Sequence, residues 1–295
     1  MPKTADSQWY VEQVADGEVH AHALTATIAQ GRSSYQSYAI VQSSLFGKML
    51  VLDGDTQSSA LDEGLYHESL VHPACAAVSA PARVLVLGGG EGATLREVLK
   101  VQSVVKATMV DIDGEVVSLC RRFLPEWSAG ALDDPRAEVV VGDAKAYVES
   151  SGERFDVIIS DLTEPRDDSP SRDMHTAEFY ARIRERLTAG GVFALQASTA
   201  GPHNFHLHAR MIATLGRVFK SVAPYSVYVP AFDTEWGFAL CGSRVPPREA
   251  AFAALVDAHS RACGLRYYDA EAHVRMFSLP KFLRDAYAQD AAQGP

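Results

Sequence analysis

Cysteine is scarce in this sequence, and its few cysteines form no recognisable motif. The four of them lie far apart and include no C-x-x-C pair: Cys75, Cys120, Cys241 and Cys263. This spacing argues against a zinc site or a disulfide framework and favours a reducing, cytoplasmic environment. The amino terminus lacks the apolar stretch of a signal peptide, and no run approaches the roughly 18 apolar residues of a membrane span. We therefore expect no secretion signal and no membrane partner.

An excess of basic residues is also missing. The chain has 27 Lys and Arg against 37 Asp and Glu, a formal charge of 27 − 37 = −10. Nucleic-acid-binding proteins normally carry a basic surface, so we expect no nucleic-acid partner. The acidic balance suits a cationic partner, although it is also common among ordinary soluble proteins. With 295 residues, 47% of them hydrophobic, the chain suits one large globular domain or a domain plus a small one.

The stretch Val84–Asp113 contains an apolar run, a glycine-rich turn, an amphipathic segment and a second apolar run that ends at Asp111. This order is typical of a βαβ unit that binds an adenosine-bearing ligand at the carboxyl ends of parallel strands, with the acidic residue on the ribose hydroxyls. A glycine turn by itself fits a purely structural turn equally well. Glu91 lies inside the turn and would repel a pyrophosphate, which argues against NAD and favours an adenosine ligand with a positive charge.

Short alternating apolar runs before residue 60 predict a small antiparallel β unit. These runs are Val19–Ile28, Tyr35–Gln42 and Lys48–Leu52, with turn signals at Asp16-Gly17, Gly31, Phe46-Gly47 and Asp53-Gly54. Asp62–Ala77 then predicts a helix in which His72-Pro73 is an irregularity.

From Val84 onward, predicted strands and helices alternate, which is typical of a doubly wound α/β sheet. We predict helices over Gly114–Leu124, Ala144–Glu149, Thr176–Leu187 and His206–Phe219. We predict further strands over Ala137–Val141, Phe155–Ser160, Gly191–Gln196 and Ser221–Val229, with Trp236–Cys241 as an antiparallel closing strand. The chain is thus expected to hold an N-terminal antiparallel β domain over residues 1–72 and a catalytic α/β domain over residues 73–295.

Further acidic residues follow the predicted parallel strands. Asp143 comes after one strand, and Asp161 and Glu164 come after the strongly apolar Phe155–Ser160. Because the carboxyl ends of parallel strands meet at one edge, we expect these side chains to share one crevice with Glu91 and Asp111. So many like charges favour a bound cation. The alternative is that each carboxylate caps a helix or pairs with an arginine, as Asp143 could do before Ala144–Glu149.

At these residues the chain resembles the polyamine aminopropyltransferases, the family of spermidine and thermospermine synthases. The matching stretches are Tyr35-Gln36, Phe46-Gly47-Lys48, Leu52-Asp53-Gly54, Gln57, Asp62-Glu63-x-x-Tyr66-His67-Glu68, Leu87–Gly92, Arg96-Glu97, Asp111-x-Asp113, Gly142-Asp143-Ala144 and Asp161–Pro165. The resemblance implies a Rossmann-like sheet of the methyltransferase type and a homodimer or homotetramer. It also implies transfer of an aminopropyl group from decarboxylated S-adenosylmethionine, a co-substrate, to a small cationic amine, with no tightly bound cofactor.

The resemblance assigns roles residue by residue. Asp161 matches the catalytic carboxylate, and Tyr66 lies with it among the catalytic residues and along the acceptor channel. The donor-binding positions are Gln36, His67, Gly88, Gly89, Gly90, Glu91, Asp111, Asp143 and Ala144. The acceptor-binding positions are Gln57, Glu164, Gln196, Phe232 and Trp236. For Tyr66 and the glutamines, ordinary buried hydrogen bonding is the alternative.

Two positions depart from the usual spermidine synthase pattern. Glu164 stands where Asp is usual, and Phe232 stands where many members carry Tyr. Loss of that hydroxyl removes a hydrogen bond to a short diamine, so we expect a longer amine, spermidine above all, or agmatine, with putrescine also open. The stretch around Trp236 resembles thermospermine-type and related bacterial enzymes. Two other functions stay open: an S-adenosylmethionine-dependent methyltransferase, and a non-catalytic polyamine-binding protein on the same fold.

Two remaining segments carry competing interpretations. Arg166–Asp173 is expected to be a lid over the site or a solvated loop. His203-x-x-His206-x-His208 suggests a metal, but no Cys or carboxylate accompanies it at ligand spacing, and His206 and His208 cannot share a helix face. We therefore interpret these as surface histidines and expect no metal site.

Overall fold

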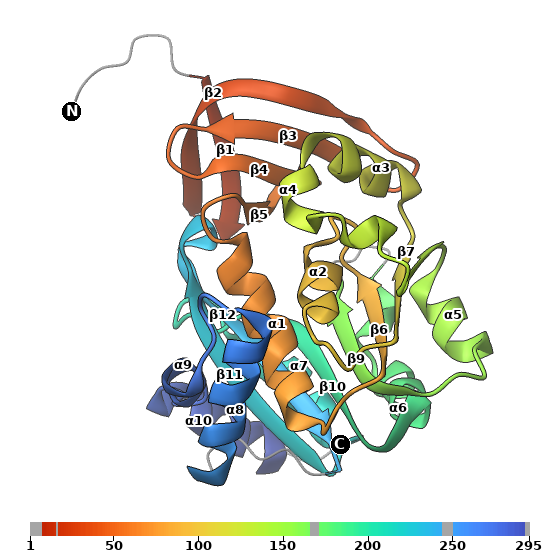
Figure 1. Ribbon diagram of the computed structural model, residues 1–295. Helices are drawn as coiled ribbons and strands as arrows, with labels where there is room; N and C mark the ends of the chain where they lie inside the picture. The colour runs from red at the N-terminus through yellow and green to blue at the C-terminus, as the bar shows by residue number, and fades with distance from the viewer. Residues whose placement is uncertain (1–7, 16, 166–170, 244–249, 293–295) are drawn as a thin grey trace.

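The computed structural model describes residues 8–15, 17–165, 171–243 and 250–292, and its strands form two sheets (Figure 1). The first is a five-stranded antiparallel sheet in which the strands follow one another in chain order. Its strands are β1 (Gln8–Ala15), β2 (Glu18–Arg32), β3 (Ser37–Ser43), β4 (Gly47–Leu52) and β5 (Asp55–Ser59). The predicted antiparallel β unit is confirmed.

Gly31 was predicted as a turn residue, but it lies inside strand β2 and pairs with Tyr38 of β3. A Cβ atom at residue 31 would lie 2.6 Å from the Tyr38 hydroxyl oxygen, so a larger residue there would have to displace the Tyr38 side chain. The turn between β2 and β3 is built by Ser33 instead, whose side-chain oxygen accepts from the backbone N–H groups of Tyr35 and Gln36, each at 3.1 Å.

The second sheet has seven strands in the order β11-β12-β10-β9-β6-β7-β8. Its strands are β6 (Arg83–Gly88), β7 (Lys106–Asp111), β8 (Ala137–Val141), β9 (Phe155–Asp161), β10 (Leu187–Thr199), β11 (Ser221–Val229) and β12 (Thr234–Gly242). The pairs among β6 to β10 are parallel, and β12 is antiparallel to both of its neighbours.

Strand β12 is antiparallel as predicted, but it does not close the sheet. It lies between β10 and β11, and β11 forms the edge. The four residues Phe238–Cys241 are all buried, as expected for a strand with neighbours on both sides. The apolar run WGFALC therefore marks an interior strand.

Helices cover both faces of the second sheet, which confirms the doubly wound, Rossmann-like architecture. They are α1 (Glu63–Ala77), α2 (Ala93–Leu99), α3 (Gly114–Phe123), α4 (Pro125–Ser128), α5 (Ala144–Ser150), α6 (Ala177–Arg186) and α7 (His206–Gly216). Val84 and Val86 of β6 share a core with α1 and α2, while the alternate residues Leu85 and Leu87 share one with α5, α6 and α7.

Helix α1 follows β5 and runs across the second sheet (Figure 1). All residues from Tyr66 to Cys75 are buried, so this helix has no solvent-facing stripe over that length. Pro73 lies inside it and cannot donate to the carbonyl of Ser69 four residues earlier. The Tyr225 hydroxyl of β11 donates to that carbonyl at 2.9 Å instead. The predicted division between residues 72 and 73 falls within α1, and the two-domain description stays a prediction.

The sequence patterns did not reveal three C-terminal helices: α8 (Ala250–Cys263), which packs against α1, α9 (Ala270–Met276), which packs against β11, and α10 (Lys281–Ala292), which packs against α7. The buried Glu68 of α1 anchors the segment between α8 and α9. Its carboxylate accepts from the backbone N–H groups of Arg266, Tyr267 and Tyr268 at 2.7–3.2 Å. Within the described residues, no helix combines the length and the apolar character that crossing a membrane requires.

We predict that Glu68→Ala destabilises the protein by about 3 kcal/mol, because buried backbone donors lose their acceptor. Urea denaturation at a fixed protein concentration measures this loss. Glu185→Ala, which removes a half-exposed glutamate of α6, is the control and should change the free energy of unfolding by less than about 0.5 kcal/mol. Equal effects of the two substitutions would contradict the anchoring role of Glu68.

Candidate active site

The carboxyl ends of β9, β6 and β7 lie side by side and carry the glycine turn between two aspartates. Gly88 pairs directly with Asp161, and β7 ends at Asp111. Gly88 has φ +79°, and a Cβ there would collide with the Asp161 carbonyl oxygen, so the turn can run this close only with glycine. The parallel register therefore places the predicted turn and the predicted catalytic aspartate in direct contact.

Asp111 lies under the turn. A Cβ at residue 90 would lie 2.7 Å from an Asp111 carboxylate oxygen, and the Gly90 N–H donates to this carboxylate. The Asp113 N–H donates to it as well, at 2.9 Å. Burial outweighs these hydrogen bonds and raises the pKa of Asp111 to about 6.

Asp161 is held by two neutral donors. The Tyr66 hydroxyl of α1 donates to one carboxylate oxygen at 2.9 Å, and the Thr94 hydroxyl of α2 donates to the other at 2.5 Å. Burial raises the pKa of Asp161 against the lowering effect of these bonds and of nearby His67. Burial and the Asp161 charge raise the pKa of Tyr66 well above its usual range, so its hydroxyl stays protonated. The sequence analysis did not predict Thr94 as a site residue. Its position in the first helical turn after the glycines is the feature that could have indicated it.

Glu91 is fixed by partners from two other elements. The Ser58 hydroxyl of β5 donates to one oxygen at 2.6 Å, and His67 Nε2 of α1 lies 2.8 Å from the other. His67 Nε2 also lies 3.9 Å from Asp161. Glu91, Asp111 and Asp161, called the carboxylate cluster below, thus surround the glycine turn. Ser58 carried no motif and was not predicted.

His67 links Glu91 to Glu63 and Arg96, and these four side chains are called the ion-pair chain below. His67 Nδ1 lies 2.6 Å from the Glu63 carbonyl oxygen, and the Glu63 carboxylate is paired with Arg96 at 2.8 Å. The carbonyl can only accept, and so can Glu91 in its ionised form; with Glu91 ionised both ring nitrogens donate and the ring is an imidazolium. Burial opposes this charge, but hydrogen bonds to Glu63 and Glu91 outweigh it and raise the pKa of His67 well above its usual range.

The predicted glutamines all have hydrogen-bond partners within the protein. Gln36 donates to Asp113 at 3.0 Å, Gln57 to the Asp55 carbonyl at 3.2 Å, and Gln196 to the Leu162 carbonyl at 2.5 Å. Ordinary buried hydrogen bonding, the alternative considered above, accounts for these contacts. Their roles toward a ligand stay predictions.

An aromatic group adjoins Tyr66. The Phe232 ring stands edge-on to Tyr66 with centroids 6.1 Å apart, and it contacts Trp236 at 4.8 Å. The Asp62 carboxylate accepts from the Ala231 N–H at 2.6 Å and so holds the Phe232 segment against α1.

The remaining two predicted carboxylates are placed differently. Asp143 is exposed and caps α5, accepting from the N–H groups of Lys145 and Ala146, which is the structural alternative considered above. Ala144 is buried behind it. Glu164 follows β9, and its carbonyl accepts from Ser171 at 3.1 Å. The contacts therefore join three of the five carboxylates; residues 166–170 of the predicted lid or loop lie outside the described residues.

The interpretation of all three histidines as surface residues is wrong for one of them. His203 and His206 are exposed, but His208 is fully buried. Its ring nitrogens contact the Ala197 carbonyl at 2.7 Å and the Tyr287 hydroxyl of α10 at 2.6 Å. The C-terminal helix α10, absent from the sequence-based prediction, is what buries it.

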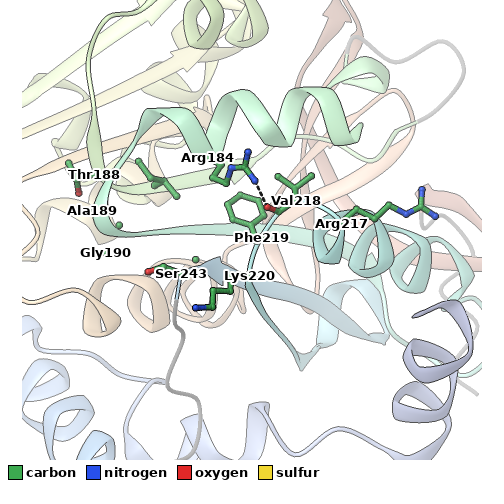
Figure 2. Close-up of a pocket in the computed structure, with 12 residues that line it drawn as sticks. Arg184, Thr188, Ala189, Gly190, Arg217, Val218, Phe219, Lys220 and Ser243 are labelled. Atoms are coloured by element: carbon green, nitrogen blue, oxygen red, sulfur yellow. Dashed lines mark hydrogen bonds between the residues drawn. The ribbon is translucent and has the colours of Figure 1, made fainter. Parts of the chain in front are cut away.

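A pocket of about 510 Å³ lies away from the carboxylate cluster (Figure 2). Its lining includes Thr188 and Gly190 at the start of β10, together with Arg184, Arg217 and Lys220. Since β10 is parallel to β9, this is the opposite edge of the sheet from Asp161. Arg184 donates to the Val218 carbonyl at 2.7 Å, so part of its donor capacity is used within the protein.

Comparisons with known proteins agree with this geometry. A family model described as the spermine/spermidine synthase domain matches residues 63–249, and one described as the spermidine synthase tetramerisation domain matches residues 8–59. A polyamine aminopropyltransferase of Aeropyrum pernix is 44% identical, over 96% of this chain and 91% of the relative. A polyamine aminopropyltransferase of a Synechococcus strain is 40% identical, over 96% and 93%.

Solved structures are similar over the whole fold. A crystal structure of spermidine synthase in complex with the transition-state analogue AdoDATO has a TM-score of 0.90 and 30% identity, covering 98% of this chain and 97% of that chain. Spermidine synthase from Thermotoga maritima has a TM-score of 0.87 and 30% identity, covering 96% and 94%.

We predict that both ring nitrogens of His67 carry protons at neutral pH, and that Glu63→Gln lowers the pKa of this ring because it removes one anionic partner. Nitrogen chemical shifts of the imidazole, followed through a pH titration, measure this, with Glu185→Gln as the control. The raised pKa stabilises the fold fully below the unfolded value of about 6.5, and the contribution is lost as the pH rises through the folded-state pKa. A neutral His67 ring at neutral pH would contradict the ion-pair chain.

Proposed function

The chain belongs to the spermine/spermidine synthase family, and on that premise we propose that it transfers the aminopropyl group of decarboxylated S-adenosylmethionine to an amine and releases methylthioadenosine. The observation that carries this proposal is the environment of Asp161. Its side chain is only 10% exposed beside the glycine turn and is hydrogen-bonded to Tyr66 and Thr94, and no arginine or lysine among the described residues pairs with it. Such a group can take a proton from an attacking amine.

The charge of the site suits cationic substrates. With Glu91, Asp111 and Asp161 ionised and His67 protonated, these contacts carry −3 + 1 = −2. The decarboxylated donor brings a sulfonium and an ammonium, which offset this charge. S-adenosylmethionine would add a carboxylate next to Glu91, and repulsion at 4 Å is worth at most about 4 kcal/mol at an effective dielectric near 20. Even half of that value corresponds to more than tenfold discrimination.

For the donor, we assign Asp111 to the ribose hydroxyls and Gly88, Gly89 and Gly90 to the backbone beneath the ligand. The Gly90 and Asp113 N–H groups hold the Asp111 carboxylate in place for that contact. We assign Glu91 and His67 to the aminopropyl end. Asp143, Ala144 and Gln36 are proposed around the adenine and the outer edge of the site; Asp143 retains one carboxylate oxygen that caps no N–H of α5.

In the proposed reaction, the amine nitrogen attacks the aminopropyl carbon bonded to sulfur. The N–C bond forms as the C–S bond breaks, the sulfur takes the electron pair, and Asp161 takes the proton from nitrogen. An amine has a pKa of about 10 by analogy with lysine, so a carboxylate with a low pKa is poorly suited to take its proton. Burial raises the pKa of Asp161 and narrows this gap. Tyr66 and Thr94 orient the carboxylate.

For the acceptor, we propose spermidine, with agmatine and putrescine as the alternatives. Phe232 and Trp236 form an aromatic wall beside Tyr66, and aromatic faces attract ammonium groups. Phe232 supplies no hydroxyl for the amine of a short diamine. Gln57, Gln196 and Glu164 are proposed to contact the remainder of the acceptor.

We also propose that the protein is a homodimer or homotetramer assembled through its first sheet. Trp9, Val11 and Val19 are more than half exposed, at 55%, 56% and 60%, and all three lie within the match to the tetramerisation domain. A cytoplasmic location is proposed as well, supported by the free state of all four cysteines.

Incubation with decarboxylated donor and each of putrescine, agmatine and spermidine tests the proposal, with methylthioadenosine as the measured product. Donor binding without methylthioadenosine from any amine would indicate a non-catalytic polyamine-binding protein. Formation of S-adenosylhomocysteine from S-adenosylmethionine would indicate a methyltransferase.

We predict that Asp161→Asn lowers kcat by about 10²–10⁴-fold, because the amide cannot accept the proton. Donor affinity, measured by calorimetry, should stay within a few-fold of wild type. Tyr66→Phe keeps the base and removes one orienting bond, so its kcat should fall less. A kcat of Asp161→Asn close to wild type would remove Asp161 from the role of base.

We predict that Glu91→Gln reduces the preference for decarboxylated over carboxylated donor by about tenfold or more, because it removes the charge that discriminates between them. Calorimetric titration of both donors gives the ratio of their dissociation constants. Ser58→Ala is the matched control, since it deletes a hydrogen bond to Glu91 but keeps the charge. A wild-type protein that binds both donors equally would refute this role.

A further inference from the structure

Three side chains with metal-binding atoms meet where α1 packs on α8. They are His72 of α1 and His259 and Cys263 of α8, and their ligand atoms all lie within 4.8 Å of one another. His72 Nδ1 lies 2.9 Å from His259 Nε2, which lies 3.9 Å from Cys263 Sγ. Helix α8 begins at Ala250, after the last residue of the family match, and none of the three residues is used in the proposed transfer reaction.

His72 makes a hydrogen bond through the ring nitrogen that faces away from His259, and this bond orients the ring for metal binding. His72 Nε2 lies 2.9 Å from a Glu97 carboxylate oxygen, and both side chains are fully buried. A carboxylate accepts, so Nε2 carries a proton, and in the neutral ring Nδ1 then holds the lone pair on the side of His259 and Cys263. Metal-ligating histidines commonly donate their second nitrogen to a carboxylate in this way, which orients the ring and raises its basicity.

Helix periodicity aligns the other two ligands. His259 and Cys263 are four residues apart and therefore lie on one face of α8. Zn–N bonds of about 2.0–2.1 Å and a Zn–S bond of about 2.3 Å in a tetrahedron place two nitrogens about 3.3 Å apart and a nitrogen and a sulfur about 3.6 Å apart. The observed separations of 2.9 and 3.9 Å each differ from these by about 0.3–0.4 Å.

The surroundings tolerate a bound cation. The two cations near Glu97 are both offset by carboxylates: Arg96 pairs with Glu97 at 2.8 Å, and Lys100 pairs with Glu97 at 2.7 Å and with Glu68 at 4.0 Å. His259 and Cys263 are partly exposed, which leaves a path for the ion and a water molecule. Two imidazoles and one thiolate form a borderline-soft ligand set, which suits Zn²⁺ and disfavours Mg²⁺ and Ca²⁺.

We propose that His72, His259 and Cys263 form a zinc site that ties α8 to α1, with water in the fourth position. On binding, a Zn–S bond forms and the Cys263 thiol releases its proton to solvent; no oxidant or reductant takes part. The cysteine spacing in the sequence argued against zinc. It could not reveal this site, because His72 and the ligands on α8 lie almost 190 residues apart in the chain. A bound ion stabilises the folded state by mass action, since this arrangement does not exist in the unfolded chain.

The test uses the full chain, stripped of metal with a chelator and titrated with Zn²⁺ against a chromophoric competitor. We expect one Zn²⁺ per chain and a rise in Tm. Co²⁺ in the same site should give a thiolate-to-metal absorption band and the intense visible bands of four-coordinate cobalt. His259→Gln and Cys263→Ser should each weaken Zn²⁺ binding by at least about tenfold and abolish the rise in Tm, and Cys263→Ser should abolish the thiolate band.

His206→Gln, which removes an exposed histidine of α7, is the matched control and should bind Zn²⁺ as wild type does. Circular dichroism establishes that each variant is folded, and the wild-type titration is informative without any variant. A wild-type chain that takes up no stoichiometric Zn²⁺ overturns the proposal. Uptake that survives both substitutions also overturns it, because the ion would then bind elsewhere, such as the carboxylate cluster.

Discussion

The buried ion pair between His67 and Glu91 is the contact on which the site depends. It joins helix α1 to the glycine turn, with Nε2 and the carboxylate 2.8 Å apart. A buried pair of this kind persists only when every remaining polar atom is satisfied. Ser58 of β5 supplies the second partner of Glu91, and Glu63, held by Arg96, supplies that of His67. The first sheet, α1, α2 and the turn are therefore positioned by one connected set of charges.

Helix α1 connects the site to the rest of the molecule, because its middle is buried and makes contacts on every side. Tyr66 and His67 face the site, and the adjacent Glu68 holds the segment between α8 and α9. Tyr225 compensates for Pro73 in the same stretch. The C-terminal helices thus support the helix that orients Asp161, although no residue of theirs contacts that carboxylate in the described structure.

The electrostatics of the site follow from the burial of carboxylates that no arginine among the described residues neutralises. Burial raises the pKa of both Asp111 and Asp161, and in Asp161 it outweighs the lowering effects of His67 at 3.9 Å and of the Thr94 and Tyr66 hydroxyls. Two cationic substrates would supply the missing positive charge, and their arrival favours the ionised carboxylates. Burial of these carboxylates therefore has two effects. It disfavours their ionised forms in the free protein, which makes Asp161 a better base, and it leaves a surface that binds cations.

Local patterns in the sequence were sufficient to predict most strands and helices as far as Cys241, the glycine turn and the acidic residues that end strands, because these depend on periodicity and on glycine's φ angles. They did not reveal α8, α9 and α10. The patterns also predicted that five carboxylates would share one crevice, since parallel strands end at one edge, and three of the five, Glu91, Asp111 and Asp161, lie around the glycine turn. The local cap that Asp143 forms on α5 was also among the alternatives that the sequence offered. Tertiary structure alone decided the more distant partners: Ser58 and Thr94 carry no motif, and α10 buries His208. It also placed β12 inside the sheet and brought His259 of α8 to His72. Such pairings join residues far apart in the chain, so no local pattern encodes them.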